Sequence, residues 1–231
     1  MIKWRIFIVF FVYFWYICCM KIVFLTGAGI SAPSGIPTFR CEGGLWSTVD
    51  IKSVATADAI EKNPIGVVKF WDDVRADMFS KQPNAAHLAI AELQGKHDVI
   101  VLTQNVDDLH EKAGSKDILH LHGDILHARA FDSLTPLYIG YDKTPIGMRQ
   151  NIVLFGEPVR HFLTAKQHIM DCDVFVVVGT SLNVHPVNSL LKTKFHMQKI
   201  IVDIEKHHKY GYENLVGSAD VVLPQLIQRW L

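Results

Sequence analysis

The stretch that decides the fold is Ile22-Val-Phe-Leu-Thr-Gly27-Ala-Gly29-Ile-Ser-Ala32. It opens on four apolar residues, a run that is typical of a buried strand in a parallel sheet. The run ends in Gly-x-Gly-x-x-Ala, a form of the dinucleotide-binding turn whose glycines permit close backbone approach to a pyrophosphate. An ordinary strand–turn–helix junction can carry the same glycines. The next residues, Pro37-Thr-Phe39-Arg40, favour the dinucleotide site because they add an aromatic ring and a guanidinium.

Composition limits the class of protein. The chain has 231 residues, of which 49% are hydrophobic and 20% charged, and its formal net charge is zero. This length suits one α/β domain with a small appendage. Because a nucleic-acid surface needs a basic excess or stripe, we expect no nucleic-acid partner.

The four cysteines are Cys18, Cys19, Cys41 and Cys172. None forms a C-x-x-C pair, so the sequence predicts no structural zinc site built from cysteine pairs. The simplest interpretation is a reduced, cytoplasmic compartment.

Residues 1–19 form an apolar extension that resembles a signal-peptide core or a short membrane anchor. The run at residues 6–20 is shorter than the roughly 20 residues that span a bilayer. No linker separates it from the strand at Ile22. We therefore favour Met20 as the physiological start, and the alternative is a protein anchored in a membrane through residues 6–20.

Hydrophobic periodicity predicts alternating strands and helices after Met20. Strands are expected at residues 98–103, 118–121, 151–155, 174–178, 199–204 and 220–223, and helices at 64–78, 84–95, 108–113, 162–170, from about 186, and at 226–231. This alternation predicts a doubly wound, parallel, Rossmann-like α/β sheet. We expect a catalytic domain at 20–231, with small-domain insertions at about 43–83 and 123–151.

Polar motifs follow the expected strands, at the sheet edge where α/β proteins bind ligands. They are Gly27-Ala-Gly-Ile-Ser31, Thr103-Gln-Asn-Val-Asp107, His122-Gly123, Phe155-Gly-Glu157 and Gly179-Thr-Ser181. In this order the motifs resemble a sirtuin, a family of NAD-dependent protein-lysine deacylases. The resemblance covers about residues 21–231 and is greatest to short bacterial and viral members.

The resemblance implies an NAD site in which NAD is consumed rather than recycled. Its implied residues are Gly27, Ala28, Gly29, Ile30, Phe39, Arg40, Gln104, Asn105, Asp107, Gly179, Thr180, Ser181 and Asp203. Asp203 stands where the family usually has an Asn on the adenosine ribose, which adds a negative charge there.

The resemblance implies that His122 is the catalytic base and that Asn105 acts beside it. An imidazole suits a general base at neutral pH because its pKa lies near 6.5. His120 is two residues away, and we interpret it as structural.

The implied partner is an acyl-lysine protein or peptide held between two loops. The implied substrate residues are Val153, Phe155, Gly156, Glu157, Leu182, Val184, Trp71 and Arg75. Sirtuins that prefer acidic acyl groups carry Tyr and Arg three residues apart on one helix. Here Trp71 is followed by Val74, and Arg75 comes one residue late, a rotation of about 100°. We therefore expect acetyl or apolar acyl groups, although Trp71 and Val74 also fit a core-facing stripe.

This chain departs from most sirtuins in lacking the zinc-binding cysteines between Gly123 and Phe155. We predict no zinc, with the small domain packed by apolar residues (Leu126, Phe131, Leu134, Leu137, Tyr138 and Ile139). Two alternatives stay open. One is an NAD glycohydrolase or ADP-ribosyltransferase that uses the same pocket, and the other is a non-catalytic NAD or ADP-ribose sensor.

Overall fold

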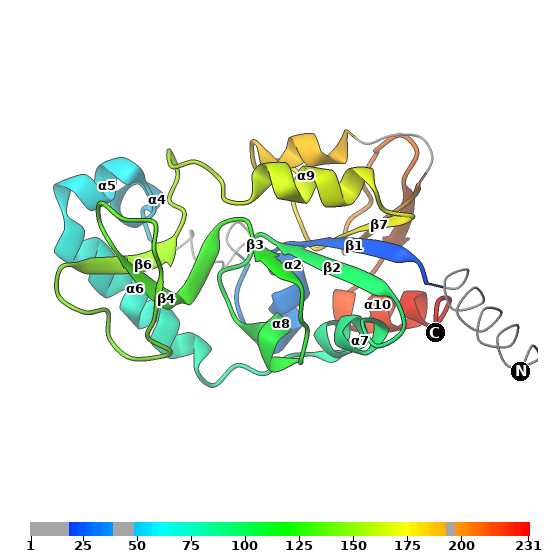
Figure 1. Cartoon of the computed structure of the whole chain (residues 1–231), viewed down its shortest axis with the longest axis horizontal. Coiled ribbons are helices and arrows are strands. Elements are labelled where there is room, and N and C mark those ends of the chain that lie inside the picture. The colour runs from blue at the N-terminus through cyan, green and yellow to red at the C-terminus, as the bar shows by residue number, and fades with distance from the viewer. Residues whose placement is uncertain (1–18, 39–48, 193–196) are drawn as a thin grey trace, which may run out of the picture.

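The computed structural model describes residues 19–38, 49–192 and 197–231. The predicted extension up to Cys18, and the predicted site residues Phe39 and Arg40, lie outside these ranges. Figure 1 shows a large part built on one twisted sheet and a smaller part beside it.

The large part is a six-stranded parallel sheet with the order β3-β2-β1-β7-β8-β9. Its strands are β1 Lys21–Thr26, β2 Asp98–Thr103, β3 Ile118–His120, β7 Val174–Val178, β8 Gln198–Asp203 and β9 Glu213–Val216. The chain reverses the direction in which strands are added between β1 and β7, so the carboxyl ends of these strands flank a topological switch point. The predicted doubly wound α/β class is confirmed.

Helices cover both faces of this sheet (Figure 1). Ile22 and Phe24 pack toward α7 (Ala85–Leu93) and α10 (Ala219–Ile227). The alternate residues Val23 and Leu25 pack toward α9 (Phe162–Met170) and the 3₁₀ helix η2 (Val187–Leu191). Burial of the strand on both faces explains why its sequence is a continuous apolar run. Short α2 (Ala28–Ser31), η1 (Ala32–Ser34) and α8 (Leu109–Lys112) follow the strands at the ligand-binding edge.

The smaller part, here called the small lobe, has three helices among the described residues and a three-stranded antiparallel sheet of order β5-β4-β6. Its elements are α4 Ile51–Val54, α5 Ala57–Lys62, α6 Pro64–Met78, β4 Gly123–Ala130, β5 Leu137–Tyr138 and β6 Met148–Ile152. Two segments far apart in the sequence therefore build one lobe.

The core of the small lobe matches the one expected only in part, because Leu126 packs against it but most of the other expected residues do not. Phe131, Leu134, Leu137 and Tyr138 are exposed, and Ile60, Val67, Trp71, Ile125, Ile152 and Leu154 form the buried cluster instead. The exposed four lie on and around short β5, at the edge of the lobe's sheet, where no described helix covers them.

Three expected elements were wrong. Residues 220–223 start helix α10 rather than forming a strand, because Leu223, Leu226 and Ile227 share the helix face that is buried on the sheet. The same helix ends at Ile227, so no separate helix runs to residue 231. The strand expected at 151–155 ends at Ile152. Among the described helices, none has the length and apolar character that crossing a membrane requires.

Candidate active site

A cavity of about 490 Å³ opens at the carboxyl ends of β1, β2, β7 and β8. We call it the sheet-edge pocket. Most predicted NAD-site residues line it, namely Gly27, Ala28, Gly29, Gln104, Asn105, Gly179, Thr180, Ser181 and Asp203. Ile30 and Asp107 do not line it but are buried behind its wall. Its volume lies within the range of small-molecule and cofactor sites.

The glycine turn lies directly on the end of β7. The Gly29 N–H donates to the Gly179 carbonyl over 2.8 Å. A Cβ atom on Gly29 would lie 2.5 Å from the Gly179 Cα, and Gly179 itself has a φ of 59°. Because both positions exclude a side chain, main-chain groups form this wall of the pocket, as a site for a pyrophosphate requires.

A buried polar network stands behind the turn. The Asn105 side chain donates to the Gly27 carbonyl and to the Ser31 hydroxyl, both over 3.1 Å. The Ser31 hydroxyl donates in turn to the Asp107 carboxylate over 3.0 Å. Burial raises the pKa of Asp107 to about 6, against hydrogen bonds from the Leu109 main chain and from Ser31 that lower it. The network fixes the Asn105 amide at the pocket wall.

Gln104 connects two of the loops at this edge. Its side-chain amide donates to the Thr180 hydroxyl over 3.1 Å, which joins the loop after β2 to the loop after β7. Asp203, at the end of β8, lies on the pocket wall with its carboxylate 3.2 Å from Nε2 of His207.

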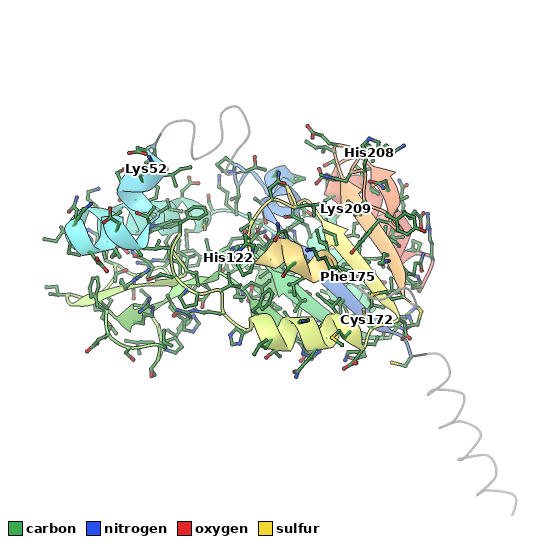
Figure 2. All side chains as sticks on the ribbon, turned by 90° about the horizontal axis from the view of Figure 1, so that it is seen from above. Lys52, His122, Cys172, Phe175, His208 and Lys209 are labelled. Carbon is green, nitrogen blue, oxygen red and sulfur yellow. The ribbon has the colours of Figure 1, made fainter. Side chains whose placement is uncertain are left out.

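His122 is oriented by the chain itself. Its Nδ1 atom lies 2.9 Å from the Gln104 carbonyl oxygen, so Nδ1 must carry the hydrogen. Burial lowers the pKa of His122, against the hydrogen bond to Gln104. The neutral ring therefore keeps a lone pair on Nε2, the atom that a general base uses. In Figure 2 this histidine lies between the small lobe and the large sheet.

A second cavity, of about 170 Å³, lies between the small lobe and the sheet edge. We call it the junction pocket. Its wall is mostly apolar and includes Ala55, Trp71, Val106, Ile152, Val153, Leu154, Phe155 and Val184. Gln104, His122 and Val184 line both pockets, so the two cavities meet at the histidine.

The segment at residues 153–157 is held at both ends of the junction pocket. The Val153 N–H donates to the His122 carbonyl over 2.7 Å, and the Phe155 N–H donates to the Ala55 carbonyl over 2.8 Å. The Glu157 carboxylate accepts from the Leu154 N–H over 2.8 Å and from Arg149 over 2.5 Å. Glu157 therefore connects this segment to the buried Arg149 side chain.

Trp71 lines the junction pocket, but Arg75 does not. The Trp71 indole lines the junction pocket and donates to the Val54 carbonyl over 2.8 Å. Arg75 is 1% exposed and lines neither pocket, because its guanidinium contacts Asp72, Thr144 and the Ile125 carbonyl. Arg75 follows Val74 by one residue on α6, and its side chain points into the interior of the small lobe.

The side chain of Leu182, another predicted substrate residue, is buried. It lines neither of the two larger pockets and packs into the core beneath α9 and η2. Two residues that the sequence analysis did not select also support the site. Ser31 lies inside the quoted motif, which was a usable signal, whereas nothing in the sequence indicated that Arg149 reaches Glu157.

Within residues 19–38, 49–192 and 197–231, no group of three or more His, Cys, Asp or Glu side chains could hold a metal ion.

Comparison with known proteins assigns the family. A family model described as the Sir2 family matches residues 27–186. The chain belongs to the Sir2 family. A relative from Aggregatibacter actinomycetemcomitans, named NAD-dependent protein deacylase, is 44% identical over 205 residues, which cover 84% of this chain and 97% of the relative.

Solved Sir2 structures share the fold. A mutant Sir2 homologue in complex with ADP-ribose has a TM-score of 0.83 and 33% identity, covering 91% of this chain and 92% of that one. A Sir2 protein bound to a myristoylated histone peptide has a TM-score of 0.68 and 31% identity, covering 90% of both chains.

Proposed function

We propose that this Sir2-family protein removes acyl groups from protein lysines, with NAD as a consumed substrate and nicotinamide and O-acyl-ADP-ribose as products. The observation that carries the proposal is the position of His122, whose ring lines both the sheet-edge pocket and the junction pocket. NAD would occupy the first pocket and the acyl-lysine the second. The reacting groups of the two substrates would then meet beside the Nε2 atom.

The bond changes follow from that meeting point. The acyl oxygen attacks the anomeric carbon of the nicotinamide ribose, and the C–N bond to nicotinamide breaks. His122 then takes a proton from a ribose hydroxyl, which attacks the resulting imidate carbon. The bond from this carbon to the lysine nitrogen breaks, the amine leaves with a proton, and water adds to give O-acyl-ADP-ribose. The Gln104 carbonyl supports this step because it keeps the ring hydrogen on Nδ1 and leaves Nε2 as the acceptor.

The NAD site is supported by the lining of the sheet-edge pocket. The Gly27–Gly29 turn and Gly179 would face the pyrophosphate with main-chain groups, and Asn105 and Asp107 would position the ribose and the carboxamide. We also propose that Ile30, Phe39 and Arg40 belong to the NAD site. Asp203 would face the adenosine ribose.

The peptide would lie along residues 153–157, where main-chain hydrogen bonds give affinity without a strict sequence requirement. The apolar junction pocket and the withdrawal of Arg75 favour acetyl or other apolar acyl groups over acidic ones. A strong preference for a succinyl peptide over an acetyl peptide would overturn this specificity.

We also propose that the small lobe, which corresponds to the insertions at about 43–83 and 123–151, folds without zinc. Several polar groups in its interior are joined by hydrogen bonds, with Asp72 accepting from Gln150 over 2.9 Å and Thr144 beside both. Elemental analysis that found one zinc per chain would refute this.

A cytoplasmic location with Met20 as the start is our proposal for the cell, tested by N-terminal sequencing of the native protein.

One experiment separates deacylation from its alternatives. The protein is incubated with NAD and an acetyl-lysine peptide, and the products are identified by mass spectrometry. We expect O-acetyl-ADP-ribose and deacetylated peptide. Free ADP-ribose without a need for peptide would indicate a glycohydrolase, and ADP-ribosylated protein a transferase. Binding of NAD without turnover would indicate a sensor.

A further inference from the structure

Two histidines contact the loop that carries Asn105. Besides the bond from His122 to Gln104, Nδ1 of His120 lies 3.2 Å from the main-chain oxygen of Asn105. Nε2 of His120 lies 2.7 Å from the carboxylate of Glu111 on α8. The rings of His120 and His122 therefore contact neighbouring carbonyls, those of Asn105 and Gln104.

Both nitrogens of the His120 ring face oxygen atoms that only accept hydrogen bonds. An imidazole with one hydrogen can satisfy only one of them, whereas the imidazolium satisfies both. Burial alone would lower the pKa of His120, but the hydrogen bond and the charge of Glu111 raise it above its usual value. The other titratable groups that face the ring are Asp107, His110 and Asp124.

Loss of one proton would affect the two contacts unequally. The 2.7 Å contact with a carboxylate is charge-assisted, so the remaining hydrogen favours Nε2 over Nδ1. The Asn105 carbonyl would then face a lone pair. The donor to Asn105 is therefore present only while the ring is protonated.

We propose that His120 is a positioning residue, whose Nδ1–H holds the main chain of Asn105, and that Glu111 keeps the ring in the form that donates. This inference rests on the proposed function, in which the Asn105 amide contacts NAD. The side chain of Asn105 bonds to Gly27 and Ser31, so a shift of its main chain would displace the amide at the pocket wall.

Two isosteric substitutions test which nitrogen matters. His120→Asn places an amide N–H at the position of Nδ1, and His120→Gln places it at the position of Nε2. We expect His120→Asn to retain about a third or more of kcat/KM at pH 7.5 and His120→Gln to lose about tenfold, the effect of one hydrogen bond. The loss should appear as a lower kcat and a higher KM for NAD. Equal losses in the two variants would overturn the assignment.

The role of Glu111 is tested by the pH profile. In the wild type we expect kcat/KM to fall at alkaline pH as His120 loses its proton. In Glu111→Gln, the amide N–H can donate to Nε2 of a neutral ring, so Nδ1–H stays on Asn105 and the alkaline fall should flatten. Glu92→Gln, on the exposed side of α7, is the matched control and should leave the wild-type profile unchanged. An alkaline fall that is the same in Glu111→Gln and wild type would refute the pairing.

Binding of ADP-ribose gives a readout that does not depend on turnover. Calorimetry across pH 6 to 9 should show affinity falling at alkaline pH in the wild type and in Glu92→Gln, but not in Glu111→Gln or His120→Asn. This result without deacylation would reject the proposed function and keep the inference. If the protein deacylates the peptide but the substitutions do not change the pH dependence of ADP-ribose affinity, the inference alone is rejected.

Discussion

The hydroxyl of Ser31 donates to the carboxylate of Asp107 over 3.0 Å inside the protein, where Asp107 is 5% exposed. Few hydrogen bonds reach this carboxylate, so its ionised form is costly to bury. This cost of burial raises the pKa of Asp107 to about 6.

Replacement of Asp107 by Asn should therefore stabilise the fold while it weakens the site. The folded pKa lies above the unfolded value of 3.8, so burial of the carboxylate costs stability that is fully lost above pH 6 and is regained as pH falls below 3.8. We expect Asp107→Asn to raise the free energy of unfolding by about 3 kcal/mol at pH 7.5 and by only about 0.5 kcal/mol at pH 4. Urea unfolding at both pH values checks this, with exposed Asp77→Asn as control. A variant less stable than wild type at pH 7.5 would contradict it.

Replacement of His122 by Ala should remove deacylation but keep the sheet-edge pocket. Loss of a general base costs about 10²- to 10⁴-fold in rate. ADP-ribose affinity should change little, because main-chain groups form most of that pocket wall. Since burial lowers the pKa of His122, the wild-type acidic limb from this base should lie below pH 6.5. Steady-state rates from pH 5 to 9 measure both effects, and retained activity in the variant would remove the assignment.

His87 should make the fold sensitive to acid. Its ring is fully buried beside His110, and His87 Nε2 and His110 Nδ1 have no hydrogen-bond partner. Burial lowers the pKa of His87 to about 4. The unfolded chain therefore binds the proton first, so stability is complete above pH 6.5 and is lost as pH falls toward 4.

The matched variant is His87→Gln. His87 accepts the Asn84 N–H in a capping box at the start of α7, and Gln preserves such a box without titrating. The stability difference between wild type and variant should shift by up to about 3 kcal/mol between pH 7 and pH 4. Denaturant unfolding at each pH gives this difference, and two parallel curves would argue against it.

Glu157 should affect peptide binding more than NAD binding. Replacement by Gln would leave the buried guanidiniums of Arg149 and Arg129 without their carboxylate partner. Breaking a buried pair costs about 3 kcal/mol, and the segment at 153–157 would lose its brace. We expect a lower melting temperature and a raised KM for peptide, with a smaller change in the KM for NAD. Asp58→Asn, which breaks an exposed pair with Lys62, is the control and should be nearly neutral.

Local patterns in the sequence were sufficient for the buried strands and the long helices. The spacing of Val67, Trp71 and Met78 predicted α6 at residues 64–78, the bounds that the structure shows. By contrast, β9 carries only one apolar pair, Leu215 and Val216, and gives no run to detect. The run at 220–223 was too short to separate a strand from a buried helix, and tertiary burial against the sheet decided it.

Side-chain partners were harder to predict than elements. The rotation of Arg75 away from the Val74 direction could be worked out from helix geometry, but its partners at residues 125 and 144 could not. In the same way, nothing local shows that His120, which was interpreted as structural, reaches Asn105, fifteen residues earlier. Long-range hydrogen bonds of this kind depend on the assembled fold.

The meeting of the two pockets at Gln104, His122 and Val184 has a consequence for inhibitor chemistry. A compound that joins an ADP-ribose mimic to an apolar acyl-lysine mimic could fill both cavities across this shared wall. Binding of its first half would raise the effective concentration of the second, so the affinity of the whole could exceed that of either half by orders of magnitude. The required linker is short, because the same histidine forms part of both walls.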